Sequence, residues 1–151
     1  MLLLKELDER GFVFATNYES RKGRDLAENP HAALLFYWHA QGRQVRVEGT
    51  VERLAPAESD AIFAARPRAS RISAVASQQS RTLPSRDELL ERVRLLEVEL
   101  AGREVERPAH WGGYRLVPSA IEFWQHKDDR LHHRFVYRRG QDGWRIELLQ
   151  P

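Results

Sequence analysis

Two arginines and a histidine gather beside a tryptophan near the C-terminal end of the chain. A turn is expected at Lys127–Asp129, with the returning strand beginning at Arg130. Because side chains alternate along a strand, Arg130, His132 and Arg134 would share one face near the indole of Trp124. Adjacent cations repel unless an anion or a polarisable ring lies between them, which favours a site for an anionic, aromatic ligand. The alternative is a solvated edge strand, whose charges discourage pairing, and spacing alone slightly favours it.

Two further basic groups suit anions. Ser20 has the pattern of a helix N-cap, and Arg21 and Lys22 follow it in the first turn. Cations there oppose the helix macrodipole, so they fit a bound anion held by the helix N-terminus, or else a poorly optimised surface helix. The segment 66–71 places three arginines and Ser70 around Pro67. It suits a phosphate cradle, and equally a loop of solvated charge.

Composition limits the class of protein. A chain of 151 residues, 42% hydrophobic and 30% charged, fits one globular domain spanning residues 1–151. No apolar run is long enough for a membrane span, no signal peptide opens the chain, and a net charge of +2 does not demand nucleic acid. The absence of cysteine excludes disulfides and thiolate metal sites and fits a cytoplasmic protein. The histidines and aspartates of residues 126–133 match no closed metal motif, so no metal is predicted.

Hydrophobic patterns predict a mainly β protein with peripheral helices. The segment 32–39 is expected to be buried on both faces for much of its length. The segment 43–54 alternates, with Val45, Val47 and Val51 on one face and Gln44 on the other. Strands are expected at residues 1–5, 12–17, 32–39, 43–54, 114–116, 120–125, 130–138 and 144–149, and helices at 20–29, 56–65 and 85–102, the last of which begins with a capping box of Ser85 and Glu88.

The C-terminal segment also resembles a signature of the pyridoxamine 5'-phosphate oxidase family, close to I-E-F-W-Q-x-x-x-x-R-L-H-D-R. Here it stands as Ile121–Gln125 followed by Arg130–Arg134. Further family-like segments follow the expected order, and so many motifs in register make the resemblance specific over essentially the whole chain. These segments are Met1–Lys5, Thr16–Asn17, Ser20–Lys22, Arg43–Val45, Arg66–Arg68, Gln79–Ser80 and Trp111–Gly113.

The resemblance implies an FMN-binding split β-barrel that forms a homodimer with FMN at the subunit interface. It implies oxidation of pyridoxamine or pyridoxine 5'-phosphate to pyridoxal 5'-phosphate, with O2 as acceptor and H2O2 as product. The alternatives are a related oxidase of the phenazine-biosynthesis type and a non-catalytic flavin- or pyridoxal-phosphate-binding remnant. We also expect relatives to carry several dozen residues ahead of the position of Met1, which supply a helix and the first barrel strands.

The resemblance also assigns roles to residues. Arg130 and His132 would be catalytic, orienting the substrate's C4' carbon. The substrate would contact Lys5, Arg66, Ser70, Arg130 and His132. FMN would contact Lys5, Thr16, Arg21, Lys22, Gln44, Gln79, Ser80, Trp124 and Arg134, with Gln79 and Ser80 reaching the partner subunit.

Four positions depart from the family pattern. Ala15 and Ile62 stand where relatives usually carry tyrosines that contact the flavin and the substrate phosphate, respectively. His133 replaces an aspartate, and Leu148 replaces an arginine. Each lost charged hydrogen bond weakens binding by about 1.5–3 kcal/mol. We therefore expect a weaker or altered enzyme, and the two missing tyrosines leave room for a different substrate.

Overall fold

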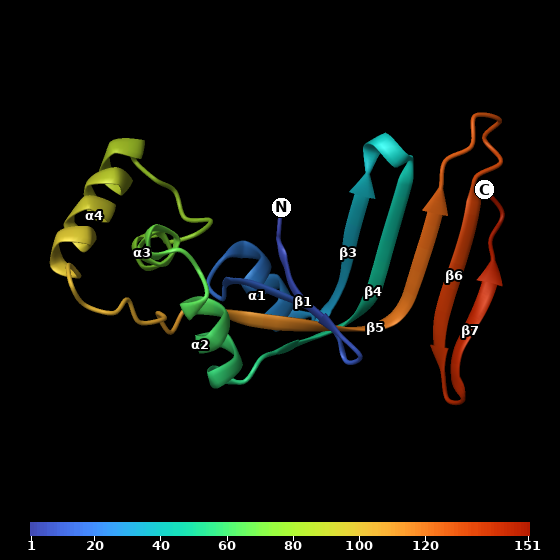
Figure 1. Cartoon of the computed structure of the whole chain (residues 1–151), viewed down its shortest axis with the longest axis horizontal. Helices are drawn as coiled ribbons and strands as arrows, with labels where there is room; N and C mark the ends of the chain where they lie inside the picture. Colours follow the sequence, from blue (N-terminus) through green and yellow to red (C-terminus); the bar gives the residue numbers. More distant parts are fainter.

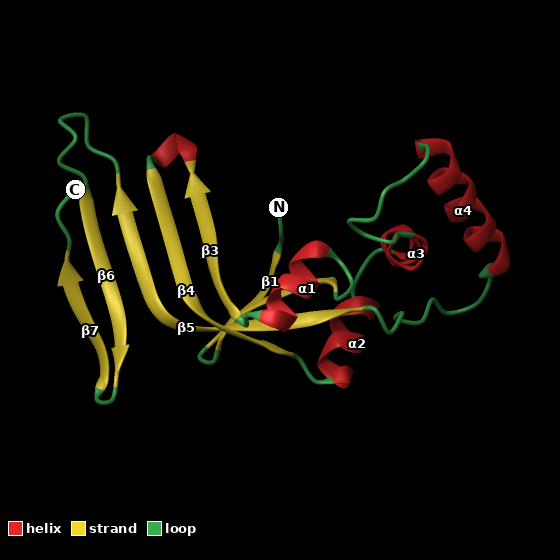
Figure 2. Ribbon diagram, turned by 180° about the vertical axis from the view of Figure 1, so that it is seen from behind, coloured by secondary structure: helices red, strands yellow, loops and turns green.

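Seven antiparallel strands form one sheet, and four α-helices gather toward one end of the molecule (Figures 1 and 2). The computed structural model describes all 151 residues. The strands are β1 (Leu4–Asp8), β2 (Gly11–Asn17), β3 (His31–Trp38), β4 (Arg43–Arg53), β5 (Trp111–Gln125), β6 (His133–Gly140) and β7 (Gly143–Leu148). The helices are α1 (Arg21–Glu28), α2 (Pro56–Ala64), α3 (Arg68–Ala76) and α4 (Arg86–Glu99).

The long strand β5 organises the sheet. The strand order is β1-β2-β5-β4-β3, while β6 pairs with β5 and β7 pairs with β6. The N-terminal half of β5 pairs with β2 and its C-terminal half with β6, while β4 follows both halves. The register shifts at Pro118–Ala120, where a bulge accommodates a proline that cannot donate a ladder hydrogen bond. The sequence pattern predicted two strands here, and the structure shows one bent strand (Figure 1).

The core consists of two hydrophobic clusters. One lies within the curved sheet and contains Phe14, Val47, Val51, Tyr114 and Leu116. This cluster confirms the predicted alternation of residues 43–54, because Val47 and Val51 point inward. The second cluster lies against the helices and contains Phe63, Ile72, Ala74, Val105 and Trp111. Since Trp111 and Leu116 belong to different clusters, the first half of β5 joins the two parts of the core.

A buried ion network ties the first hairpin to α2. The side chain of Arg115 is only 2% exposed and donates to Asp8 Oδ1 at 2.6 Å. The same guanidinium lies 3.5 Å from Glu58 of α2. Because a buried guanidinium needs carboxylate partners to offset its lost hydration, this network fixes the β1–β2 turn relative to α2.

The helix boundaries follow local capping rules in two places and depart from expectation in a third. Ser20 caps α1 by accepting from the backbone N–H of Gly23, and Ser85 caps α4 by accepting from that of Glu88, as predicted. Helix α1 ends at Asn29, just before Pro30. The segment after Pro67, which was expected to be a loop, forms α3 instead. Its proline sits at the N-cap, outside the helix, where it breaks no helical hydrogen bond.

Three strand predictions were wrong in detail. The first strand starts at Leu4 and not at Met1, because pairing with β2 begins there. Strand β3 is not buried on both faces: its side chains alternate between half-buried and exposed over most of its length, because Ala32, Leu34 and Phe36 pack against the first core cluster while the residues between them face away from it. The returning strand β6 starts at His133, and Arg130 lies in the preceding turn with a left-handed φ of 67°.

Candidate functional site

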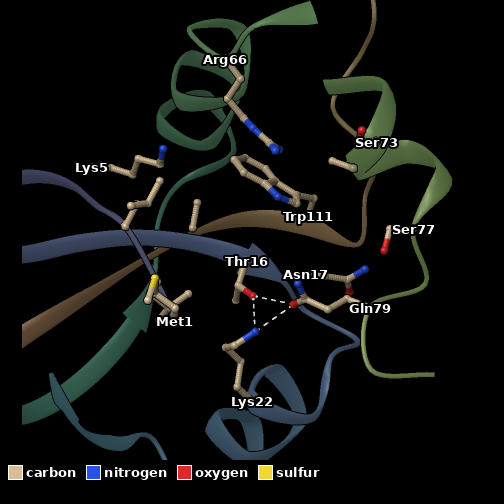
Figure 3. A pocket seen from close by; sticks show the side chains of 14 residues that line it. Met1, Lys5, Thr16, Asn17, Lys22, Arg66, Ser73, Ser77, Gln79 and Trp111 are labelled. Atoms are coloured by element: carbon tan, nitrogen blue, oxygen red, sulfur yellow. Dashed lines mark hydrogen bonds between the residues drawn. The ribbon is translucent and has the colours of Figure 1, made fainter. Parts of the chain in front are cut away.

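A polar cavity of about 370 Å³ lies beside β1 and β2, between α1 and α3 (Figure 3). It brings together five residues that the sequence predicted for binding, Lys5, Thr16, Lys22, Arg66 and Gln79. These residues come from β1, β2, α1 and the loops that flank α3, so only the folded chain makes them neighbours. We call this cavity, with its predicted residues, the polar cavity.

One end of the polar cavity is a hydrogen-bonded triad. Lys22 Nζ donates to Thr16 Oγ1 at 3.0 Å and to Gln79 Oε1 at 2.9 Å. The Thr16 hydroxyl donates to the same Gln79 oxygen at 3.0 Å (Figure 3). An ammonium group has three donors, so one N–H of Lys22 remains for a ligand. Partial burial lowers the pKa of Lys22, which means that its charge is poorly compensated and would be stabilised by an anion.

The opposite end of the polar cavity holds a second cation. Arg66 lies over the indole of Trp111, with its Cζ 4.8 Å from a ring centroid. Its Nη1 is buried without a hydrogen-bond partner, and burial lowers its pKa. Lys5 lies near Arg66, and Lys22 lies across the cavity from both (Figure 3). A buried guanidinium N–H without a partner is costly, so this end is suited to an anionic acceptor.

The remaining predicted residues of this region stand outside the cavity wall. Arg21 and Ser80 are exposed, and Ser70 is half-buried on α3, but none of the three lines the polar cavity. Ser80 has a left-handed φ of 73°, so the loop turns sharply directly after Gln79.

Four polar or aromatic residues of the cavity were missed. Asn17 and Trp111 lie within family-like segments but carried no assigned role, and both line the cavity. Ser73 and Ser77 line it from α3 and the residue that caps it. Their i, i+4 spacing places them on one helix face, a signal that reading this segment as a loop concealed.

A second group of predicted residues lies in register across three strands. Gln44 of β4 pairs with Trp124 of β5, and Trp124 pairs with Arg134 of β6. Residues paired in this way point to the same face of the sheet. We call these three residues the strand row. Gln44 and Trp124 line a second cavity, of about 660 Å³, which shares no residue with the polar cavity.

The loop before β6 brings His132 to the strand row. Its ring centroid lies 4.7 Å from that of Trp124. Its Nδ1 accepts from the backbone N–H of Lys127 at 3.1 Å, so in the neutral imidazole the proton is on Nε2. Arg130, in contrast, does not share a strand face with His132 and Arg134, because it belongs to the turn.

The four departures from the family pattern lie in different environments. Ala15 lines the polar cavity directly, where its small side chain leaves space. Ile62 packs against the helix-side core cluster. His133 pairs with Gln125 at the start of β6, and Leu148 is exposed opposite Phe135. Ala15 is therefore the departure that changes the shape of the polar cavity.

Comparison with solved structures defines the class of fold. PhzG from Burkholderia lata 383, solved with tetrahydrophenazine-1-carboxylic acid, superposes with a TM-score of 0.93 at 35% identity, over 99% of this chain and 73% of that chain. A pyridoxamine 5'-phosphate oxidase-related, FMN binding protein from Nostoc punctiforme superposes with a TM-score of 0.78 at 16% identity, over 99% and 79%. The chain thus has the FMN-binding split-barrel fold, as predicted.

Sequence comparison then defines the family. The family described as pyridoxamine 5'-phosphate oxidase matches residues 1–98, and the pyridoxine 5'-phosphate oxidase C-terminal dimerisation region matches residues 111–151. A pyridoxine/pyridoxamine 5'-phosphate oxidase from Psychromonas ingrahamii is 55% identical over all of this chain and 70% of its own length. That from Paraburkholderia phymatum is 57% identical, over 71% of its length. The chain belongs to the pyridoxamine 5'-phosphate oxidase family.

Two classes of feature are not found among the residues of the chain. No helix combines the length and the apolar composition that crossing a membrane requires. No three His, Cys, Asp or Glu side chains converge as metal ligands would.

Proposed function

We propose that the chain oxidises pyridoxamine or pyridoxine 5'-phosphate to pyridoxal 5'-phosphate, with FMN as cofactor and O2 as the final acceptor. The observation that carries this proposal is the polar cavity, whose two ends each present a cation suited to an anionic group. Relatives more than half identical over the whole chain bear the name of this activity.

The residues present fit FMN. Lys22 has a free N–H beside the N-terminal end of α1, and the neighbouring Thr16 and Gln79 supply further polar contacts. A phosphate is well placed by such an ammonium and helix N-terminus together. We assign FMN contacts to these residues, to Lys5, Arg21 and Ser80, and to the strand row of Gln44, Trp124 and Arg134. FMN supplies the two-electron acceptor when bound.

The substrate phosphate is assigned to the other end of the polar cavity. Arg66 offers a buried N–H without a partner, and Lys5 adds a second cation, with Ser70 nearby on α3. Arg130 and His132 would hold the pyridine ring so that its C4' carbon faces the flavin. The Nε2–H of His132 is available to donate to a polar group of the ring.

The C4' carbon of the substrate loses a hydride equivalent, and its hydroxyl or amine loses a proton, which gives an aldehyde or an imine. Water hydrolyses the imine to the aldehyde and ammonia. O2 accepts the two electrons with two protons and leaves as H2O2.

The site is proposed to form between two copies of the chain. The polar cavity and the strand row occupy separate parts of one chain, near α1 and α3 and near β6, respectively (Figure 1). A match of residues 111–151 to a dimerisation region supports a homodimer. We propose that the strand row of one copy completes the polar cavity of the other, with FMN between them.

The test is to purify the 151-residue chain after expression with FMN present, and to record its visible spectrum, its mass in solution and its H2O2 production with pyridoxamine 5'-phosphate. A yellow dimer that forms H2O2 and pyridoxal 5'-phosphate in equal amounts is expected. A yellow dimer without turnover would refute the substrate, and a colourless product would refute the cofactor.

A second candidate is an oxidase of the phenazine-biosynthesis type. The similarity to PhzG, with a TM-score of 0.93, favours it, as does the space left by Ala15 in the polar cavity. The unpartnered N–H of Arg66 favours a phosphorylated substrate instead. Parallel assays with pyridoxamine 5'-phosphate and with a reduced phenazine carboxylate distinguish the two, because only the first needs a phosphate site.

A further inference from the structure

Glu122 of β5 places a buried carboxylate between two arginines. Its side chain is 7% exposed. Oε1 accepts from Arg134 Nε at 2.7 Å, and Oε2 accepts from Arg46 Nη2 at 2.9 Å. Glu122 pairs directly with Arg46 across the β4–β5 ladder, while Arg134 reaches it diagonally from its own pairing with Trp124. Each carboxylate oxygen therefore accepts a hydrogen bond from an arginine of a different strand, β6 or β4.

Arg134 is held from a second side by the end of the chain. Its Nη1 donates to the backbone carbonyl of Gln150 at 3.0 Å, and its own carbonyl accepts from the N–H of Leu149 at 2.9 Å. A guanidinium has five N–H donors. With Nε bound to Glu122 and one Nη1–H bound to Gln150, three N–H groups remain for a ligand, one on Nη1 and two on Nη2.

We propose that Glu122 is a positioning residue that fixes the guanidinium of Arg134 beside Trp124, so that its free edge meets the flavin. This inference rests on the proposed function. An arginine side chain has several rotatable bonds, and fixing it before the ligand arrives removes an entropic cost of binding. Glu122 reaches no ligand in this role and acts only through Arg134.

The electrostatics agree with this geometry. The hydrogen bond from Arg134, with smaller help from Arg46, holds the pKa of Glu122 below its usual value. The same carboxylate raises the pKa of Arg134. The pair is thus ionised at neutral pH, and the position of Arg134 does not depend on a titration near neutrality.

A purely structural role is the competing explanation, and Arg46 separates the two. Arg46→Gln removes the other ion pair of the same buried carboxylate without touching Arg134. Glu147→Gln removes an exposed pair with Arg138 on the same hairpin. Both are controls, because neither residue is assigned to the flavin or the substrate.

The experiment is a double-mutant cycle in the dissociation constant of FMN, measured by quenching of flavin fluorescence. Glu122→Gln should weaken FMN binding about tenfold, because a misplaced Arg134 would lose about one charge-assisted hydrogen bond to FMN. In an Arg134→Lys background the same change should weaken it less than about twofold, because the residue through which Glu122 acts is gone. Arg46→Gln and Glu147→Gln should stay within about twofold of the wild type.

Two results would overturn the inference. If the losses of FMN affinity in the two single variants multiply in the double variant, Glu122 acts without Arg134. If Arg46→Gln weakens FMN binding as much as Glu122→Gln does, the effect is a general one of stability. If Glu122→Gln fails to fold, Glu122→Asp keeps the charge but shortens its reach, and it should weaken FMN binding while the apo-protein still folds. An unchanged dissociation constant in that variant would refute the proposal.

Failure of the proposed function remains distinguishable. Slow exchange of the Arg134 Nε–H in the NMR spectrum of the apo-protein, lost in Glu122→Gln but kept in Glu147→Gln, reports positioning without any flavin. A wild-type chain that shows this protection and binds no FMN would refute the proposed function and the flavin role of Arg134. A wild-type chain that binds FMN without this protection would refute the positioning alone.

Discussion

Arg66→Ala should separate substrate binding from cofactor binding. The guanidinium has a buried Nη1 without a protein partner, so the substrate phosphate would be its first strong acceptor. Losing one charge-assisted hydrogen bond costs about 1.5–3 kcal/mol. At about 1.4 kcal/mol per factor of ten, the KM for pyridoxamine 5'-phosphate should rise roughly 10- to 150-fold.

FMN affinity should change much less in the same variant. Lys22, with Thr16 and Gln79, lies across the polar cavity from Arg66 (Figure 3). We expect the dissociation constant of FMN to stay within about threefold, measured by fluorescence titration beside steady-state oxygen uptake. Pyridoxamine without its phosphate should have the same KM in both proteins, because it offers Arg66 no acceptor.

The matched control is Arg68→Ala. Arg68 carries the same charge two positions further on, but it donates to the carbonyls of Leu100 and Arg103 and does not line the cavity. It should lower Tm and leave the KM unchanged. Equal losses of substrate and FMN binding in Arg66→Ala, or no loss of either, would show that the phosphate has been assigned to the wrong end of the cavity.

Three further outcomes follow from the same structure. Lys22→Met should weaken FMN binding about 10- to 100-fold without lowering the Tm of the apo-protein, because burial already disfavours the ammonium; a fluorescence titration measures the first and a thermal melt the second. The pKa of Glu122 lies below its usual 4.5, so its contribution to the free energy of unfolding is complete above pH 4.5 and is lost as the pH falls through the lowered pKa; the difference between Glu122→Gln and the wild type in urea melts should therefore shrink in acid. Arg115→Met should lower the free energy of unfolding by about 1.5–3 kcal/mol in urea melts, because it removes the charge-assisted bond from a buried guanidinium to Asp8, and it should lower it much more than Arg94→Met at an exposed pair does.

Local signals predicted the elements that local physics controls. Ser20 and Ser85 were identified as N-caps because a hydroxyl must satisfy free N–H groups at a helix start, and both do so. The alternation of residues 43–54 was confirmed because one face of β4 must enter the core. Helix α3 was missed because three arginines and a proline suggested a loop, whereas Ile72 and Ala74 are buried as members of the second core cluster.

The site could be predicted only where a family pattern carried information that spacing does not. Nothing local shows that Lys5, Lys22 and Arg66 converge, because their approach depends on the pairing of β1 with β2 and on the position of α3. Arg130 shows where a local pattern misleads. Strand alternation grouped it with His132 and Arg134, but Arg130 lies in a left-handed turn ahead of β6, where side chains do not alternate as on a strand. The roles of all these residues in binding stay predictions.

Strand β5 has a genetic consequence in the proposed homodimer. Trp111, in the polar cavity, and Trp124, in the strand row, are separated by thirteen steps of this one strand, at most roughly 43 Å at about 3.3 Å per residue. If each ligand lies between the polar cavity of one copy and the strand row of the other, a mutation at either end of β5 disables both sites of a dimer whose two chains carry it. A chain damaged at Lys22 and a chain damaged at Trp124, produced in one cell, would nevertheless pair to give one intact site. Two defective alleles of a single gene would then complement each other, as if the ends of β5 belonged to separate genes.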